Sequence, residues 1–235
     1  MQITILRSLE AAATPLPDIT PATVHQLFPA TPLANIAANL PHVLAALAAA
    51  GLTDAPMLLM ALATIRAEAE PFLPLTEQPS RFNTSPGAHP GALSNHLFDL
   101  YDHRADLGNH GPPDGASFRG RGFVQLTGRA NYTRYARELS LDLVAHPELA
   151  ADPAVAATLL ARFLAGREPA IRAALAANNL AAARRLVNGG SNGIDRFTAA
   201  YTTGRHLLPW LDSSNSATAS GQPKRISHQE PNTRV

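Results

Sequence analysis

The chain of 235 residues contains no cysteine. It therefore has no disulfide framework, no thiol nucleophile and no cysteine-based zinc or iron–sulfur site. Charge is also sparse and balanced, because 19 basic residues face 18 acidic ones for a net charge of +1. That balance argues against bulk nucleic acid as a partner. A hydrophobic content of 46% nevertheless suffices for a sizeable core, so the chain as a whole is not disordered.

Long apolar runs are missing as well. The longest, Val43 to Leu52, is rich in alanine and too short to cross a bilayer. The first residues, MQITILRSLE, contain an acid and lack the apolar centre of a signal peptide. We therefore expect cytoplasmic synthesis without membrane insertion, followed by release through lysis or a specialised secretion machine.

Alanine-rich segments with regularly spaced leucines dominate the chain, and the alternation typical of strands is almost absent. This pattern predicts a mainly α fold. Asp152-Pro153 has the form of a helix start, and Gly166 stands where that helix would end. The expected helices cover residues 33–50, 55–68, 129–139, 153–165, 168–177, 179–187 and 194–207.

Two segments interrupt the helical pattern. Residues 73–118 are rich in Pro, Gly, Asn and His, which predicts a long ordered loop region of the kind that usually carries function. The tail 212–235 is polar and small and is expected to be disordered. We therefore divide the chain into an extension (1–32), a single domain (33–211) and this tail.

Glu68 is the first candidate catalytic residue. It continues the apolar face formed by Met57, Ala61 and Ile65, and Pro71 ends the helix just after it. Partial burial and the negative helix end both favour the proton-bearing form, as a general acid requires. The alternative is an ordinary solvated side chain at a frayed helix end.

A second group of carboxylates lies between Phe98 and Asn109, where three aspartates alternate with Tyr, His and Arg. An aspartate beside such neighbours would stay ionised, as a general base requires. Two carboxylates in contrasting surroundings are the arrangement used in glycoside hydrolysis. The alternative is that these acids cap turns.

Residues 118–135, FRGRGFVQLTGRANYTRY, form the third candidate segment. Phe123 to Thr127 is the best short strand of the sequence. Aromatic and amide side chains here suit a sugar site, although core packing explains the aromatics equally well. One Gly-Arg-Gly is a weak signal for RNA, and the spacing of a phosphate-binding loop is missing.

A last segment, residues 184–197, joins two helices through Val187-Asn188-Gly189-Gly190. Asn-Gly-Gly stops a helix, so this segment is at least a turn. Its Asn188 amide could also hold an N-acetyl group or a water.

Together these segments resemble glycoside hydrolase family 19, which comprises chitinases and endolysins, over about residues 33–208. The most specific parts are the run from Gly120 to Tyr132 and the Val187-Asn188-Gly189-Gly190 turn. The order of glutamate helix, loop carboxylate, GRG-x-x-QLT segment and NGG turn also agrees. The resemblance implies a helical, bilobal, lysozyme-like fold (α+β, with a minimal β element) around a substrate cleft.

The resemblance also implies roles for individual residues. Glu68 matches the general acid, although Ala67 and Ala69 replace its usual polar neighbours. Asp102 aligns with the general base, which in much of the family is a glutamate. The remaining implied contacts are Thr127 for the attacking water, Asn188 for substrate, Arg196 for a supporting ion network, and Gln125, Asn131 and Tyr132 for the cleft lining.

By this resemblance the enzyme inverts configuration at β-1,4-linked N-acetylglucosamine and needs no metal or other cofactor. Its partner would be chitin or bacterial peptidoglycan, which share the same glycosidic geometry, and the protein would act as a monomer. The alternative is a non-catalytic relative that binds amino-sugar polymers.

Overall fold

A computed structural model describes residues 19–86, 96–188, 190 and 192–208. Helices account for most of this part of the chain, which confirms the expected mainly α fold. The elements are α1 (Pro21–His25), α2 (Leu33–Ala49), α3 (Ala55–Glu68), β1 (Leu75–Thr76), α4 (Asp99–Asp102), η2 (Ala105–Leu107), α5 (Asp114–Ser117), β2 (Arg121–Gly122), α6 (Arg129–Leu139), η3 (Pro147–Ala151), α7 (Pro153–Ala165), α8 (Glu168–Ala176), α9 (Leu180–Asn188) and α10 (Ile194–Leu207).

Helix α3 is the centre of the core. It starts at an Asp54 cap, whose carboxylate accepts the Met57 amide at 3.3 Å, with Pro56 in its first turn. Nearly all of its residues are buried. Helix α10 packs along it so tightly that a Cβ on Gly204 would lie 2.3 Å from Leu59 Cδ2. This packing fixes the end of α3, where Glu68 stands.

The long helices expected from the sequence are confirmed, with ends that agree to within one residue. Asp152 caps α7 by accepting the amides of Ala154 and Val155, and Gly166 follows its last turn, both as expected. The short elements α1, α4 and α5 were not foreseen, because four or five residues carry no readable helical period.

The expected strand at Phe123–Thr127 is wrong. The strand β2 instead covers Arg121–Gly122 and pairs antiparallel with β1, with Leu75 opposite Gly122. The chain then turns at once, because Gln125 adopts a φ of 51° and Leu126 returns to bond with Arg121. This turn places the QLT segment beside the short sheet rather than in it.

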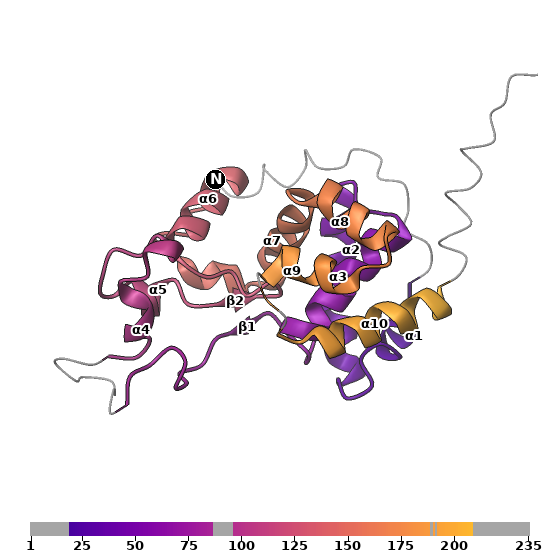
Figure 1. The fold of residues 1–235 in the computed structure, drawn as a ribbon, viewed down its shortest axis with the longest axis horizontal. Coiled ribbons are helices and arrows are strands. Elements are labelled where there is room, and N and C mark those ends of the chain that lie inside the picture. The colour runs from indigo at the N-terminus through magenta and orange to yellow at the C-terminus, as the bar shows by residue number, and fades with distance from the viewer. Residues whose placement is uncertain (1–18, 87–95, 189, 191, 209–235) are drawn as a thin grey trace, which may run out of the picture.

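Figure 1 shows two groups of elements on either side of the β1–β2 ribbon. Helices α1–α3 and α7–α10 form the larger group, and α4, α5 and α6 form the smaller one. This arrangement agrees with the bilobal expectation. Within the described ranges, no helix is long and apolar enough to cross a membrane.

Part of the expected N-terminal extension packs on the larger group. Val24 and Phe28 are buried, and the Phe28 ring meets Phe72 edge-on at 4.9 Å between centroids. The Leu27 carbonyl also accepts from Arg66 on α3. Residues 19–32 therefore contribute to the core, whereas 1–18 and the expected tail 212–235 lie outside the described residues.

Candidate active site

A pocket of about 500 Å³ contains Glu68 and a second carboxylate, Glu77. Side chains from both groups of elements form its wall. Its lining residues are Glu68, Glu77, Tyr101, Leu107, Val124, Gln125, Leu126, Thr127, Asn131, Phe163, Val187 and Asn192. Two cavities of about 590 and 580 Å³ lie elsewhere, along α8 and α10, and no acidic residue lines either of them. Of these three cavities in the described part of the chain, the Glu68–Glu77 pocket is the one lined by carboxylates.

Glu68 is the last residue of α3, and its side chain is 18% exposed. Met57, Ala61 and Ile65 are fully buried behind it, so the expected apolar face exists. Its Oε1 accepts from the Arg184 guanidinium at 2.7 Å.

Arg184, only 1% exposed, is a partner of Glu68 that the sequence did not reveal. Its other contact is the Asn192 carbonyl, so helix α9 and the following turn hold the guanidinium in place. The fixed guanidinium orients Glu68 and places a positive charge beside it, although Arg184 itself does not line the pocket.

Glu77 is the functional candidate that sequence reasoning missed. It directly follows strand β1, and its amide bonds to the Gly120 carbonyl at 2.8 Å. Its Oε1 accepts from Asn83 and from the Tyr101 hydroxyl, both at 2.9 Å, while Oε2 accepts from the Gly120 amide at 3.0 Å. A glutamate after a two-residue strand has no local signature in the sequence.

Gly120 marks the point where three pocket residues meet. A Cβ built on it would lie 2.8 Å from Gln125 Oε1, 3.2 Å from Glu77 Oε2 and 3.3 Å from Thr127 Oγ1. The glycine leaves this point open. Glu77 Oε2 and Thr127 Oγ1 therefore both lie close to the side of Gly120 where a side chain would stand.

Three expected cleft residues do line the pocket. Thr127 donates to the Gln125 carbonyl at 2.9 Å, and Asn131 donates to the Thr127 carbonyl at 2.8 Å. Gln125 is held by two backbone carbonyls, those of Leu75 and Gly122. These bonds fix the wall of the pocket next to Glu77.

Tyr132 requires a correction, because it is fully buried and does not line the pocket. Its hydroxyl accepts from Arg121 and donates to the Arg119 carbonyl. Burial raises the pKa of this phenol, against the lowering effect of the two arginines. Tyr132 therefore supports the Gly-Arg-Gly segment from behind.

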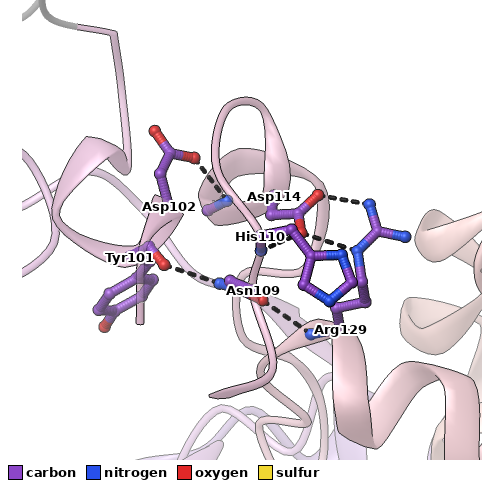
Figure 2. A network of polar contacts seen from close by, with 7 residues as sticks. Tyr101, Asp102, Asn109, His110, Asp114 and Arg129 are labelled. Carbon is purple, nitrogen blue, oxygen red and sulfur yellow. Dashed lines mark hydrogen bonds and ion pairs between the residues drawn. The ribbon is translucent and has the colours of Figure 1, made fainter. Parts of the chain in front are cut away.

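Asp102, the base expected from the sequence, also requires a correction. It is 1% exposed, does not line the pocket, and bonds the Gly115 amide at 2.8 Å and His96 at 2.5 Å. Figure 2 shows it among contacts that join α4 and α5. A carboxylate enclosed in this way does not reach a water in the Glu68–Glu77 pocket.

The other two aspartates of that cluster are also outside the pocket. Asp99 accepts from the Ser85 hydroxyl and amide, which lower the pKa of its carboxyl. Asp106 is exposed and pairs with Arg104, which likewise lowers its pKa. Both acids therefore make contacts outside the pocket, although neither side chain caps the short helix in which it stands.

Arg196 lies next to the acid but does not contact it. It donates to the Ala67 carbonyl at 3.1 Å and to Glu70 at 3.3 Å. Arg196 therefore belongs to an ion network with Glu70 and Arg66, whereas Arg184 is the arginine that contacts Glu68. Asn188 ends helix α9, and its side chain lies outside the described part of the structure.

Among the described residues, no group of three or more His, Asp or Glu side chains is arranged to hold a metal ion. The pocket instead offers two carboxylates, hydrogen-bonding side chains and apolar surfaces from Leu107, Val124, Phe163 and Val187. Such a mixture suits a sugar ring, which has both polar edges and apolar faces.

The fold has counterparts among solved structures. Chitinase C from Streptomyces griseus aligns with a TM-score of 0.51 over 81% of this chain and 76% of its own, at 20% sequence identity. The chain shares the chitinase C fold. A mutant of chitinase C aligns over 83% of this chain and 76% of its own, with a TM-score of 0.49 and 16% identity.

The likeness to chitinase C confirms the family 19 resemblance at the level of the fold. No protein-family profile and no curated protein sequence matches the chain. Any argument about activity therefore depends on the residues of the pocket.

Proposed function

We propose that this protein is an inverting glycoside hydrolase that cleaves β-1,4 bonds in polymers containing N-acetylglucosamine. Glu68 would be the general acid and Glu77 the general base. The observation that carries the proposal is that both carboxylates line one pocket, with Thr127 beside the second. The chitinase fold supports the same reaction class.

The hydrogen bonds of Glu77 indicate where the water would bind. A carboxylate has about four lone-pair sites. Two donors already occupy Oε1, and one occupies Oε2. We place the water between the remaining site on Oε2 and Thr127 Oγ1, farther from Gly120 than a Cβ would lie, because both oxygens lie close to this glycine. Thr127 uses its proton for the Gln125 carbonyl, so its oxygen is available to accept from that water.

The proposed reaction transfers two protons. Glu68 gives its proton to the glycosidic oxygen as the bond from that oxygen to the anomeric carbon breaks. The water oxygen attacks the anomeric carbon from the opposite face, and its proton passes to Glu77. Arg184 then stabilises the carboxylate formed on Glu68, because its charge lies in place before the reaction.

Replacement of each carboxylate tests these roles. We expect Glu68→Gln and Glu77→Ala each to lower kcat on chitin oligosaccharides by about 100-fold or more, since each removes a proton-transfer step. Azide should restore turnover to Glu77→Ala but not to Glu68→Gln, and the product should be a glycosyl azide. The azide anion attacks the anomeric carbon directly, because it has no proton that a base must remove. Near-normal hydrolysis by either variant would overturn that assignment.

Asp102→Asn is the matched control for these variants. It changes a buried aspartate on α4 that does not line the pocket. If Glu77 is the base, Asp102→Asn should lower kcat far less than Glu77→Ala does, because it removes no proton-transfer step. A variant that remains fully folded but loses turnover as completely as Glu77→Ala would restore Asp102 as the base.

A further inference from the structure

The Tyr101 hydroxyl donates to Glu77 Oε1 at 2.9 Å, and Asn83 donates to the same oxygen at the same distance. Two donors on Oε1 prevent the carboxylate from rotating freely. Its other oxygen, Oε2, is thereby kept towards Gly120 and Thr127. Tyr101 thus influences which oxygen of Glu77 faces the proposed water.

Tyr101 is suited to act as a permanent donor. It is partly buried in the pocket wall. Burial, together with the negative charge and hydrogen bond of Glu77, raises the pKa of its phenol to about 12. The hydroxyl therefore keeps its proton below about pH 12, which includes the neutral range in which a carboxylate base is ionised.

A buried network holds the backbone of Tyr101 (Figure 2). Asn109, 6% exposed, donates to the Tyr101 carbonyl at 2.8 Å and accepts from the Arg129 amide at 2.9 Å. The Arg129 side chain in turn pairs with Asp114 at 2.7 and 2.5 Å. Helix α4 is thereby attached to the starts of α5 and α6.

The residue after Tyr101 belongs to the same network. Asp102 accepts the Gly115 amide, and a Cβ on Gly115 would lie 2.1 Å from the Phe98 carbonyl oxygen. This close approach of α5 to α4 is possible only at a glycine. The buried aspartate that the sequence presented as a base thus forms part of the support for Tyr101.

We propose that Tyr101 is a positioning residue for Glu77, and that the network of Asp102, Asn109, Asp114 and Arg129 holds it there. This inference rests on the proposed function, because it assigns Tyr101 a role through the proposed base. It needs no contact between Tyr101 and the reacting atoms. A substrate-binding role for the same hydroxyl would have different kinetic consequences.

Tyr101→Phe tests the inference, because it removes the hydroxyl and keeps the ring. We expect kcat on a chitin oligosaccharide to fall about 10-fold or more, from the loss of one hydrogen bond to a charged group, with KM unchanged within about twofold. Tyr135→Phe, which removes the hydroxyl of a buried tyrosine outside the pocket, is the control and should leave both constants unchanged.

The decisive comparison uses the Glu77→Ala background. If Tyr101 acts through Glu77, adding Tyr101→Phe to Glu77→Ala leaves the azide-rescued rate unchanged. If azide gives no rescue, the residual hydrolysis rates of Glu77→Ala and of the double variant are compared instead, and we expect them to be equal. A further loss in the double variant, or a raised KM in Tyr101→Phe alone, would show direct action on substrate and overturn the inference.

The two proposals fail in different ways. Near-normal turnover by Glu77→Ala would refute the proposed base. An inactive Glu77→Ala combined with normal turnover by Tyr101→Phe would refute only the positioning role. Thermal melting of each variant identifies a loss that comes from unfolding.

Discussion

At the scale of single residues, three side-chain oxygen atoms lie around Gly120. Glu77 Oε2, Thr127 Oγ1 and Gln125 Oε1 all lie within 3.3 Å of the point where an alanine at this position would place its methyl group. A glycine here has two effects: its amide donates to Glu77, and its missing side chain leaves space. The proposed reaction would need that space as well as the two carboxylates.

We expect Gly120→Ala to lower kcat about 100-fold or more, because the methyl group would crowd Glu77 Oε2 and Thr127 Oγ1, the two oxygens proposed to hold the water. Its closest contact is the end of the Gln125 side chain, which can shift, so the fold should survive. Turnover and thermal melting measured together check this. Retained turnover in the folded variant would place the water elsewhere.

Helices α4, α5 and the start of α6 form one connected unit at the scale of elements. Each helix is too short or too polar to be stable by itself; α4 and α5 have four residues each. Buried hydrogen bonds and the Asp114–Arg129 pair join them instead. The position of Tyr101, and through it that of Glu77, depends on this unit.

The Asp114–Arg129 pair predicts a pH dependence of stability. The hydrogen bond from Arg129 lowers the pKa of Asp114, so the carboxylate stabilises the fold above the unfolded-state pKa of about 3.9. That contribution is lost as pH falls through the lower folded-state pKa. Asp114→Asn should therefore lower the free energy of unfolding by about 1–3 kcal/mol at pH 7.

Denaturant unfolding at several pH values measures this effect. The difference between Asp114→Asn and the parent protein should shrink below about pH 4 and vanish once Asp114 is protonated in both states. Asp106→Asn is the matched control, because it removes an exposed pair with Arg104, and it should change little at any pH. A constant difference down to pH 2 would contradict the electrostatic origin.

The pocket joins the two groups of elements at the scale of the whole molecule. Glu68, Phe163 and Val187 come from α3, α7 and α9, whereas Tyr101 and Asn131 come from α4 and α6. Glu77 follows the ribbon between these groups. The relative position of the two groups therefore affects the distance between Glu68, the proposed acid, and Glu77, the proposed base.

A product analysis tests the proposed reaction of the intact protein. Time-resolved NMR of chitin oligosaccharide hydrolysis should show the α-anomer first, because water attacks from the face opposite the leaving group. The β-anomer as first product would contradict inversion. Parallel digestion of colloidal chitin and purified sacculi, with analysis of the released ends, distinguishes the two polymers.

The sequence by itself determined the long helices and the place of Glu68 at the end of one of them. Apolar period, an Asp cap and terminating Pro or Gly residues are local, so they placed α3 and ended it at Glu68. The resemblance carried by the Gly-Arg-Gly segment likewise led to Gln125, Thr127 and Asn131, which line the pocket. These features depend on near neighbours or on one compact motif.

Only the tertiary structure decided the second carboxylate and the partners of both. Glu77 meets Tyr101 and Gly120 across 24 and 43 residues of sequence, and Glu68 meets Arg184 across 116. No local pattern encodes such contacts. Asp102 looked more catalytic because polar neighbours surround it in sequence, yet burial against Gly115 makes it structural. The burial and the orientation of a side chain depend on how distant elements pack. Here that packing places Glu77, the proposed base, in the pocket and encloses Asp102 outside it.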